Sequence, residues 1–119
     1  MKTTIITTVQ EWIPESEQWF EELFREQDAV SDYSVLKKLA EVCIEYFKST
    51  NVADTDTANE IIKVVSMLYQ SSNQYTRNAI ENEFLRELSM DESPASLKKH
   101  LTFLPIELRK EYIKTILEN

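Results

Sequence analysis

The chain has 119 residues, a length that leaves little room for a second core. Of these residues, 42% are hydrophobic and 29% are charged, so there is enough apolar material for one core. It contains no glycine, and this disfavours phosphate-binding loops, dinucleotide fingerprints and the tight hairpin turns that need positive φ angles. The 21 acidic residues outnumber the 13 basic ones, giving a net charge of −8, and a charge of this sign repels nucleic acids and anionic membrane surfaces.

The first predicted element is a helix that ends before Pro14, because proline lacks the N–H group that would continue the helix. Apolar residues recur here at intervals of three and four, the period of an α-helix. The apolar stripe consists of Ile5, Ile6, Val9, Trp12 and Ile13. The threonines within residues 3–8 are β-branched, so an extended conformation is the alternative for this segment.

A strongly amphipathic second helix is predicted to start at Pro14, which suits a first helical turn. Glu15 and Glu17 then lie at the helix N-terminus, where the helix dipole favours negative charge. Its apolar face comprises Trp19, Phe20, Leu23 and Phe24, and its acidic face comprises Glu21, Glu22 and Glu26.

The third and fourth predicted helices supply most of the core. The third is capped by Asp32 or Ser34, runs to near Ser49 and carries Cys43 in its apolar stripe. A polar loop is expected at residues 50–57. The helix predicted after it, residues 58–70, is apolar on nearly all sides, so we expect other helices to surround it. The polar seam of this fourth helix is Glu60, Lys63 and Ser66.

Three more helices complete the prediction. Asn73 can cap a fifth helix over residues 74–88, and Ser93 followed by Pro94 marks the start of a short sixth helix. The fifth helix directs Ile80, Phe84 and Leu88 inward, and the sixth carries Leu97 and Leu101. Pro105 starts the last helix. Its expected inward residues are Leu108, Tyr112, Ile113, Ile116 and Leu117.

Short helices joined by short loops predict an all-α fold, a single domain over residues 1–119. The expected architecture is a bundle of about six to seven helices in antiparallel hairpins, which could pack like one irregular HEAT-type unit.

The acidic excess is concentrated between residues 11 and 32, which hold eight acidic residues and a single base, Arg25. The negative electrostatic potential of this segment steers a basic protein partner toward it. The predicted partner-binding residues are Glu15, Glu17, Glu21, Glu22, Glu26, Asp28 and Asp32. The alternative is that these carboxylates only keep the domain soluble.

Aromatic and polar side chains offer two further candidates for partner binding. Trp12 and Trp19 lie close to the acidic segment, and we expect Trp19 to belong to the core while the exposure of Trp12 stays open. A row of Asn78, Asn82 and Arg86 on the fifth helix can bond a partner or simply be hydrated.

No catalytic residue, metal site or cofactor is predicted, so we do not expect an enzyme. His100 is the single histidine, and we expect a partly exposed structural residue. Pairs of glutamates four residues apart occur, but without the Glu-x-x-His element of di-iron bundles.

Cys43 is the single cysteine, and we expect a buried, inert thiol. A disulfide within the chain is therefore impossible, and no apolar run approaches the ~20 residues that span a bilayer. These features predict a cytoplasmic protein without an export signal or membrane anchor.

Several short motifs resemble a family of uncharacterised small bacterial all-helical domains. They are Trp12-Ile13-Pro14-Glu15, Trp19-Phe20, Asn78-Ala79-Ile80, Phe84-Leu85-Arg86-Glu87-Leu88 and Leu104-Pro105 with Leu108-Arg109. In that family a helix ends at a proline, an asparagine-led helix ends in a Phe-Leu motif, and a closing helix follows Leu-Pro. Arg86 departs from the pattern, which has an apolar or small residue there. The resemblance implies the fold and carries no catalytic residue.

At the level of class, the chain is also similar to the immunity proteins that neutralise bacterial toxins. The expected function is therefore a non-catalytic protein-binding domain, an immunity-type inhibitor of a basic toxin. The alternative is a helical adaptor or a self-associating regulatory domain, in which Tyr112, Ile116 and Leu117 meet a second copy. The oligomeric state is not predicted.

Overall fold

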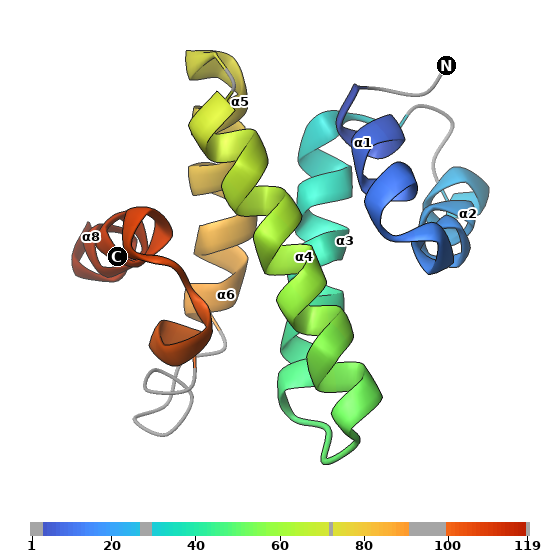
Figure 1. Ribbon diagram of the computed structural model, residues 1–119. Coiled ribbons are helices and arrows are strands. Elements are labelled where there is room, and N and C mark those ends of the chain that lie inside the picture. Colours follow the sequence, from blue (N-terminus) through green and yellow to red (C-terminus); the bar gives the residue numbers. More distant parts are fainter. Residues whose placement is uncertain (1–3, 27–29, 72, 91–99, 119) are drawn as a thin grey trace.

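The computed structural model describes residues 4–26, 30–71, 73–90 and 100–118, and every regular element in these ranges is helical (Figure 1). The elements are α1 (Thr4–Trp12), η1 (Pro14–Ser16), α2 (Glu17–Glu26), α3 (Asp32–Phe47), α4 (Val52–Ser71), α5 (Gln74–Ala79), η2 (Ile80–Leu85), α6 (Arg86–Met90) and α8 (Ile106–Glu118). Residues 100–103 add one further helical turn. The predicted all-α bundle is confirmed.

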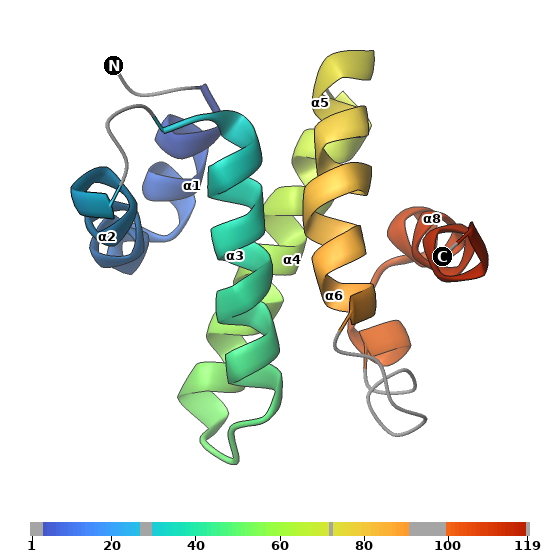
Figure 2. The ribbon, with the colours of Figure 1, turned by 180° about the vertical axis from the view of Figure 1, so that it is seen from behind.

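The helices are arranged around α3, which packs against α1, α2, α4, α5, η2 and α6, whereas α4 packs against α1, α3 and α5. Successive long helices run in opposite directions, so that α4 returns alongside α3, and the continuous helix α5–η2–α6 then runs back beside α3 (Figures 1 and 2). On one flank α2 covers α3, and on the other flank α8 packs against η2 and α6. The prediction that the helix of residues 58–70 is the central one is therefore wrong, because α3 contacts most of the other helices and α4 packs against only part of the bundle.

The first segment is helical rather than extended, because burial of one stripe outweighs the low helix propensity of its threonines. The buried residues of this stripe are Ile5, Ile6, Val9 and Ile13. Trp12 was predicted in the stripe but is 57% exposed, since it lies at the edge of the stripe in the last turn. Phe24 of α2 is likewise exposed, because Ser16, Phe20 and Leu23 form the buried side of η1 and α2.

Two predicted helix starts are wrong. The cap of α3 is Ser31, whose Oγ accepts a hydrogen bond of 3.2 Å from the Ser34 amide, and neither Asp32 nor Ser34 takes that place. Residues 50–57 were expected to form a loop, but α4 begins at Val52. Asn51 Oδ1 accepts a bond of 2.9 Å from the Ala53 amide, and this cap allows a polar sequence to start the helix.

The helix α5–η2–α6 begins where predicted, with Asn73 Oδ1 accepting a 3.0 Å bond from the Thr76 amide. Its middle part, η2, is π-helical. The wider turns of a π-helix place Leu85 as well as Phe84 on the buried side. The predicted inward residues Ile80, Phe84 and Leu88 are all buried.

The C-terminal prediction is only partly confirmed. Ser93, Pro94 and Leu97 lie outside the described residues. In α8, Leu108 and Tyr112 are buried, but Ile113 is 44% and Leu117 is 80% exposed. The reason is that α8 lies at the edge of the bundle, where η2 and α6 cover one side of it (Figure 1).

Candidate functional site

The carboxylates of the first two helices gather on one flank of the molecule. We call this group the acidic surface, and all of its members are exposed. It consists of Glu11, Glu15, Glu17, Glu21, Glu22 and Glu26. Arg25 is the one basic residue within residues 4–26. The helix α2 lies on the opposite flank of the bundle from α8 (Figures 1 and 2).

The outer side of α2 combines two unpaired acids with an exposed aromatic ring. Glu17 and Glu21 lie one turn apart, and Phe24 follows Glu21 by one turn, so the three side chains are neighbours. Phe24 is exposed. The carboxylates of Glu17 and Glu21 form no ion pair or hydrogen bond with the part of the chain that the structure describes. Together with Phe24, these two carboxylates form a side of α2 that is open to a partner.

Glu22 forms an ion pair within the protein. Lys38 of α3 donates a hydrogen bond of 2.8 Å to Glu22 Oε2. This bond, together with the positive charge of Lys38, lowers the pKa of Glu22. The same bond raises the pKa of Lys38, to which the negative charges of Glu22, Glu41 and Glu26 also contribute. The acidic surface is therefore partly neutralised along its border with α3.

The other predicted binding residues are not all brought together. Glu15 Oε1 accepts a 3.3 Å hydrogen bond from Thr57 Oγ1 and so lies against α4. Asp28 lies outside the described residues. Asp32 is in the first turn of α3. The pKa of Tyr75 in α5 is raised by loss of hydration of the Tyr75 hydroxyl and by the negative charge of Asp32. Asp32 thus lies at the junction of α3 and α5 rather than on α2.

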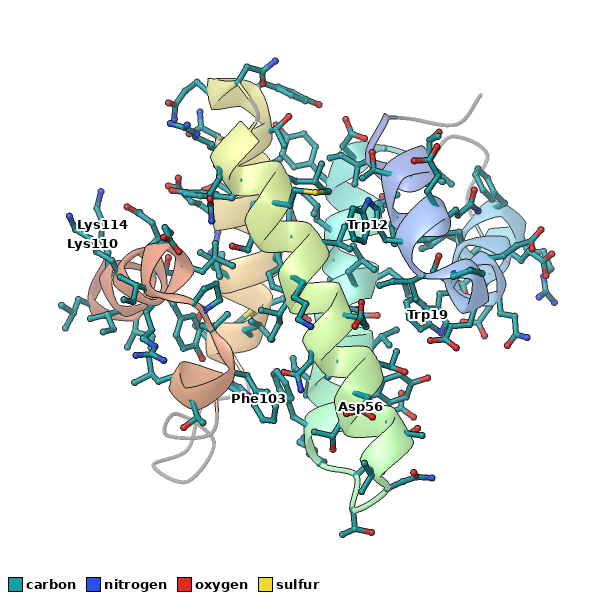
Figure 3. The ribbon with its side chains drawn as sticks, viewed as in Figure 1. Trp12, Trp19, Asp56, Phe103, Lys110 and Lys114 are labelled. Atoms are coloured by element: carbon teal, nitrogen blue, oxygen red, sulfur yellow. The ribbon has the colours of Figure 1, made fainter. Side chains whose placement is uncertain are left out.

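The two tryptophans have different surroundings. Trp19 is half-buried and packs edge-on against Tyr46 with ring centroids 6.3 Å apart, as expected for a residue that supports the core. Trp12 lies between α1 and α4 (Figure 3). There it borders a cavity of about 240 Å³ with Glu60, Lys63, Val64 and Met67 of α4. Trp12 therefore belongs to the α1–α4 junction.

The polar row predicted on the fifth helix is exposed, and exposure is compatible with a row that is only hydrated. It consists of Asn78, Asn82 and Arg86. Asn78 Oδ1 accepts a 2.8 Å bond from Gln74 Nε2.

The imidazole of His100 and the thiol of Cys43 are both buried in the core. His100 was expected to be partly exposed, but it is only 2% exposed, because its ring packs on Phe47 and Tyr112. Cys43 is fully buried as predicted, and burial raises the pKa of its thiol. In the described ranges, no three His, Cys, Asp or Glu side chains are grouped so that they could hold a metal ion.

The sequence did not predict a groove between α4 and the segment that leads into α8. Its volume is about 680 Å³. The lining residues are Asn59, Ile62, Lys63, Ser66, Met67, Gln70, Thr102, Phe103, Leu104, Pro105 and Arg109. The polar seam of the fourth predicted helix could have indicated this groove, since two of its three residues, Lys63 and Ser66, line it. The partner segment is distant in sequence and could not be assigned to it.

None of the described helices has the length and apolar character needed to cross a membrane. Comparisons with curated proteins and with solved structures gave no match. A family model described as "Domain of unknown function (DUF7674)" matches residues 6–118. The resemblance to a family of small helical domains is thereby confirmed in its broad form, whereas the similarity to immunity proteins stays a prediction. By this match over nearly its whole length, the chain belongs to the DUF7674 family.

Proposed function

We propose that the protein is a non-catalytic binding domain whose acidic surface holds a basic protein, as an immunity-type inhibitor would hold a basic toxin. The observation that carries this proposal is the outer side of α2, where exposed carboxylates surround an exposed aromatic ring. A field of one sign accelerates encounter with a partner of opposite sign, and an aromatic side chain supplies contact area at the centre of an interface.

The members of the acidic surface have different roles in this proposal. Glu17, Glu21 and Phe24 contact the partner directly. Glu22 ties α2 to α3 through Lys38, so it holds the surface in place and contributes less to binding. Such an interface loses association rate as salt screens its charges.

The proposal is tested by affinity capture of partners from the cells that make the protein, followed by elution with increasing salt and mass spectrometry. The binding variant is Glu17→Lys with Glu21→Lys. The control is Asp56→Lys with Glu107→Lys, which changes the net charge by the same amount at two exposed positions outside α2. Asp56 lies in the N-terminal part of α4 (Figure 3). We expect a basic protein that salt releases, that the control captures and that the binding variant loses. Equal capture by both variants would overturn the proposed site.

Self-association through α8 is a second candidate, favoured by one observation. Ile106, Ile113 and Leu117 are exposed and recur at spacings of seven and four, so they form one apolar stripe. Tyr112, which was predicted for this interface, is buried in the core and unavailable. Sedimentation at high salt tests this candidate: a dimer that Leu117→Lys dissociates supports it, and a monomer at all concentrations contradicts it.

A further inference from the structure

The groove between α4 and the segment before α8 has apolar walls held by packing within the protein. Ile62 and Leu104 are buried, and the ring of Phe103 stacks on Phe47 with centroids 4.8 Å apart. Figure 3 shows Phe103 on the side of this segment that faces α4. A volume of about 680 Å³ is within the usual range of sites for small molecules.

The charges that line this groove are all positive, although the chain as a whole has a net charge of −8. Lys63 and Arg109 are the two charged lining residues, and no carboxylate of the described chain lines the groove. The nearest acid to Lys63 is Glu60, whose Oε1 is 3.7 Å from Lys63 Nζ in an exposed pair. The local field therefore attracts anions where the protein's net charge repels them.

Arg109 is held in a defined position at the groove. Its Nε donates a hydrogen bond of 2.9 Å to the Leu104 carbonyl oxygen, which leaves its terminal N–H groups without a hydrogen bond to the described residues. A guanidinium fixed in this way presents parallel donors that match the two oxygens of a carboxylate.

We propose that this groove binds a small amphiphilic carboxylate. The apolar body of the ligand packs on Ile62, Met67 and Phe103, and its carboxylate group pairs with Arg109 and Lys63. This site is separate from the acidic surface of α2, which repels such a ligand, and it does not depend on the proposed binding of a basic protein.

The test uses octanoate as the probe and octan-1-ol as a neutral molecule of the same chain length. Amide signals of the ¹⁵N-labelled full chain are followed by NMR during titration with each compound. The binding variants are Lys63→Gln and Arg109→Gln. Lys110→Gln and Lys114→Gln are the matched controls, because these lysines project from the outer side of α8 (Figure 3).

We expect octanoate to shift the signals of Ile62, Met67 and Phe103 and to bind about tenfold more tightly than octan-1-ol. Each binding variant lowers the affinity for octanoate about tenfold, and the two control variants leave this affinity unchanged. Because Lys63 is exposed, Lys63→Gln keeps the test valid even if Arg109→Gln perturbs the fold.

Three results would overturn the proposal. They are shifts scattered away from the groove, equal affinity for octanoate and octan-1-ol, and no binding of octanoate.

Discussion

The Nδ1 atom of His100 lies 2.8 Å from the Tyr112 hydroxyl oxygen, and both side chains are buried. The same hydroxyl lies 3.4 Å from the Leu88 carbonyl oxygen. One phenol thus links the turn at residues 100–103, the last helix α8 and the end of α6. These contacts join three segments that meet only through tertiary packing.

Removing this hydroxyl is expected to destabilise the fold. Tyr112→Phe removes the buried hydroxyl and the hydrogen bonds that it makes, which lowers the free energy of unfolding by about 1–2 kcal/mol. Urea unfolding followed by circular dichroism measures the change. Tyr75→Phe is the control, because the Tyr75 ring is largely exposed, and its effect stays within about 0.5 kcal/mol. Equal effects of the two substitutions would show that the buried contact contributes nothing.

The cap of α4 gives a second prediction about stability. Asn51→Ala removes the bond from Asn51 Oδ1 to the Ala53 amide and is expected to cost about 1 kcal/mol. Hydrogen exchange of amides in residues 53–57 should accelerate more than exchange near Leu68. Unchanged exchange at these amides would contradict a helix that starts at Val52.

The contact between Glu22 and Lys38 predicts a dependence on pH. Because Lys38 lowers the pKa of Glu22, the pair stabilises the protein above the ordinary glutamate pKa. This stabilisation is lost as the pH falls through the lower native pKa of Glu22. The free energy of unfolding of Lys38→Met is therefore expected to fall below that of the wild type at neutral pH. The difference should disappear in acid and shrink in high salt. A difference that is the same at neutral and acidic pH would rule out the pair as its cause.

The thiol of Cys43 is expected to resist modification in the native state. It is fully buried and burial raises its pKa, so a disulfide reagent should react only as fast as the protein opens. Thr50→Cys is the control, since residue 50 is exposed, and this variant should take up one equivalent rapidly. Rapid labelling of the wild type without denaturant would contradict the buried position.

The sequence predicts the helices and their most deeply buried residues because helical periodicity is a local property. Ile80, Phe84 and Leu88 were assigned in this way. Prediction from periodicity fails at Ile113 and Leu117, since their exposure depends on which neighbouring helices cover α8. The N-terminal turn of α4 was missed because its polar residues look like a loop, and the stabilising cap is a single asparagine side chain.

The same distinction applies to the candidate sites. The acids of α2 were predicted because an amphipathic helix exposes the side opposite Phe20 and Leu23. The partner role of Lys38 was not predicted, since it lies on another helix. The groove was missed for a related reason, because Lys63 and Arg109 come together only after the chain has folded.

The affinity of the purified partner complex at several salt concentrations tests the central claim most directly. For Glu17→Lys with Glu21→Lys, we predict weaker binding and a shallower salt dependence than for the wild type. The control Asp56→Lys with Glu107→Lys should keep both properties. Unchanged affinity of the α2 variant, in a protein that unfolds like the wild type, would contradict the claim that the acidic surface is a binding site.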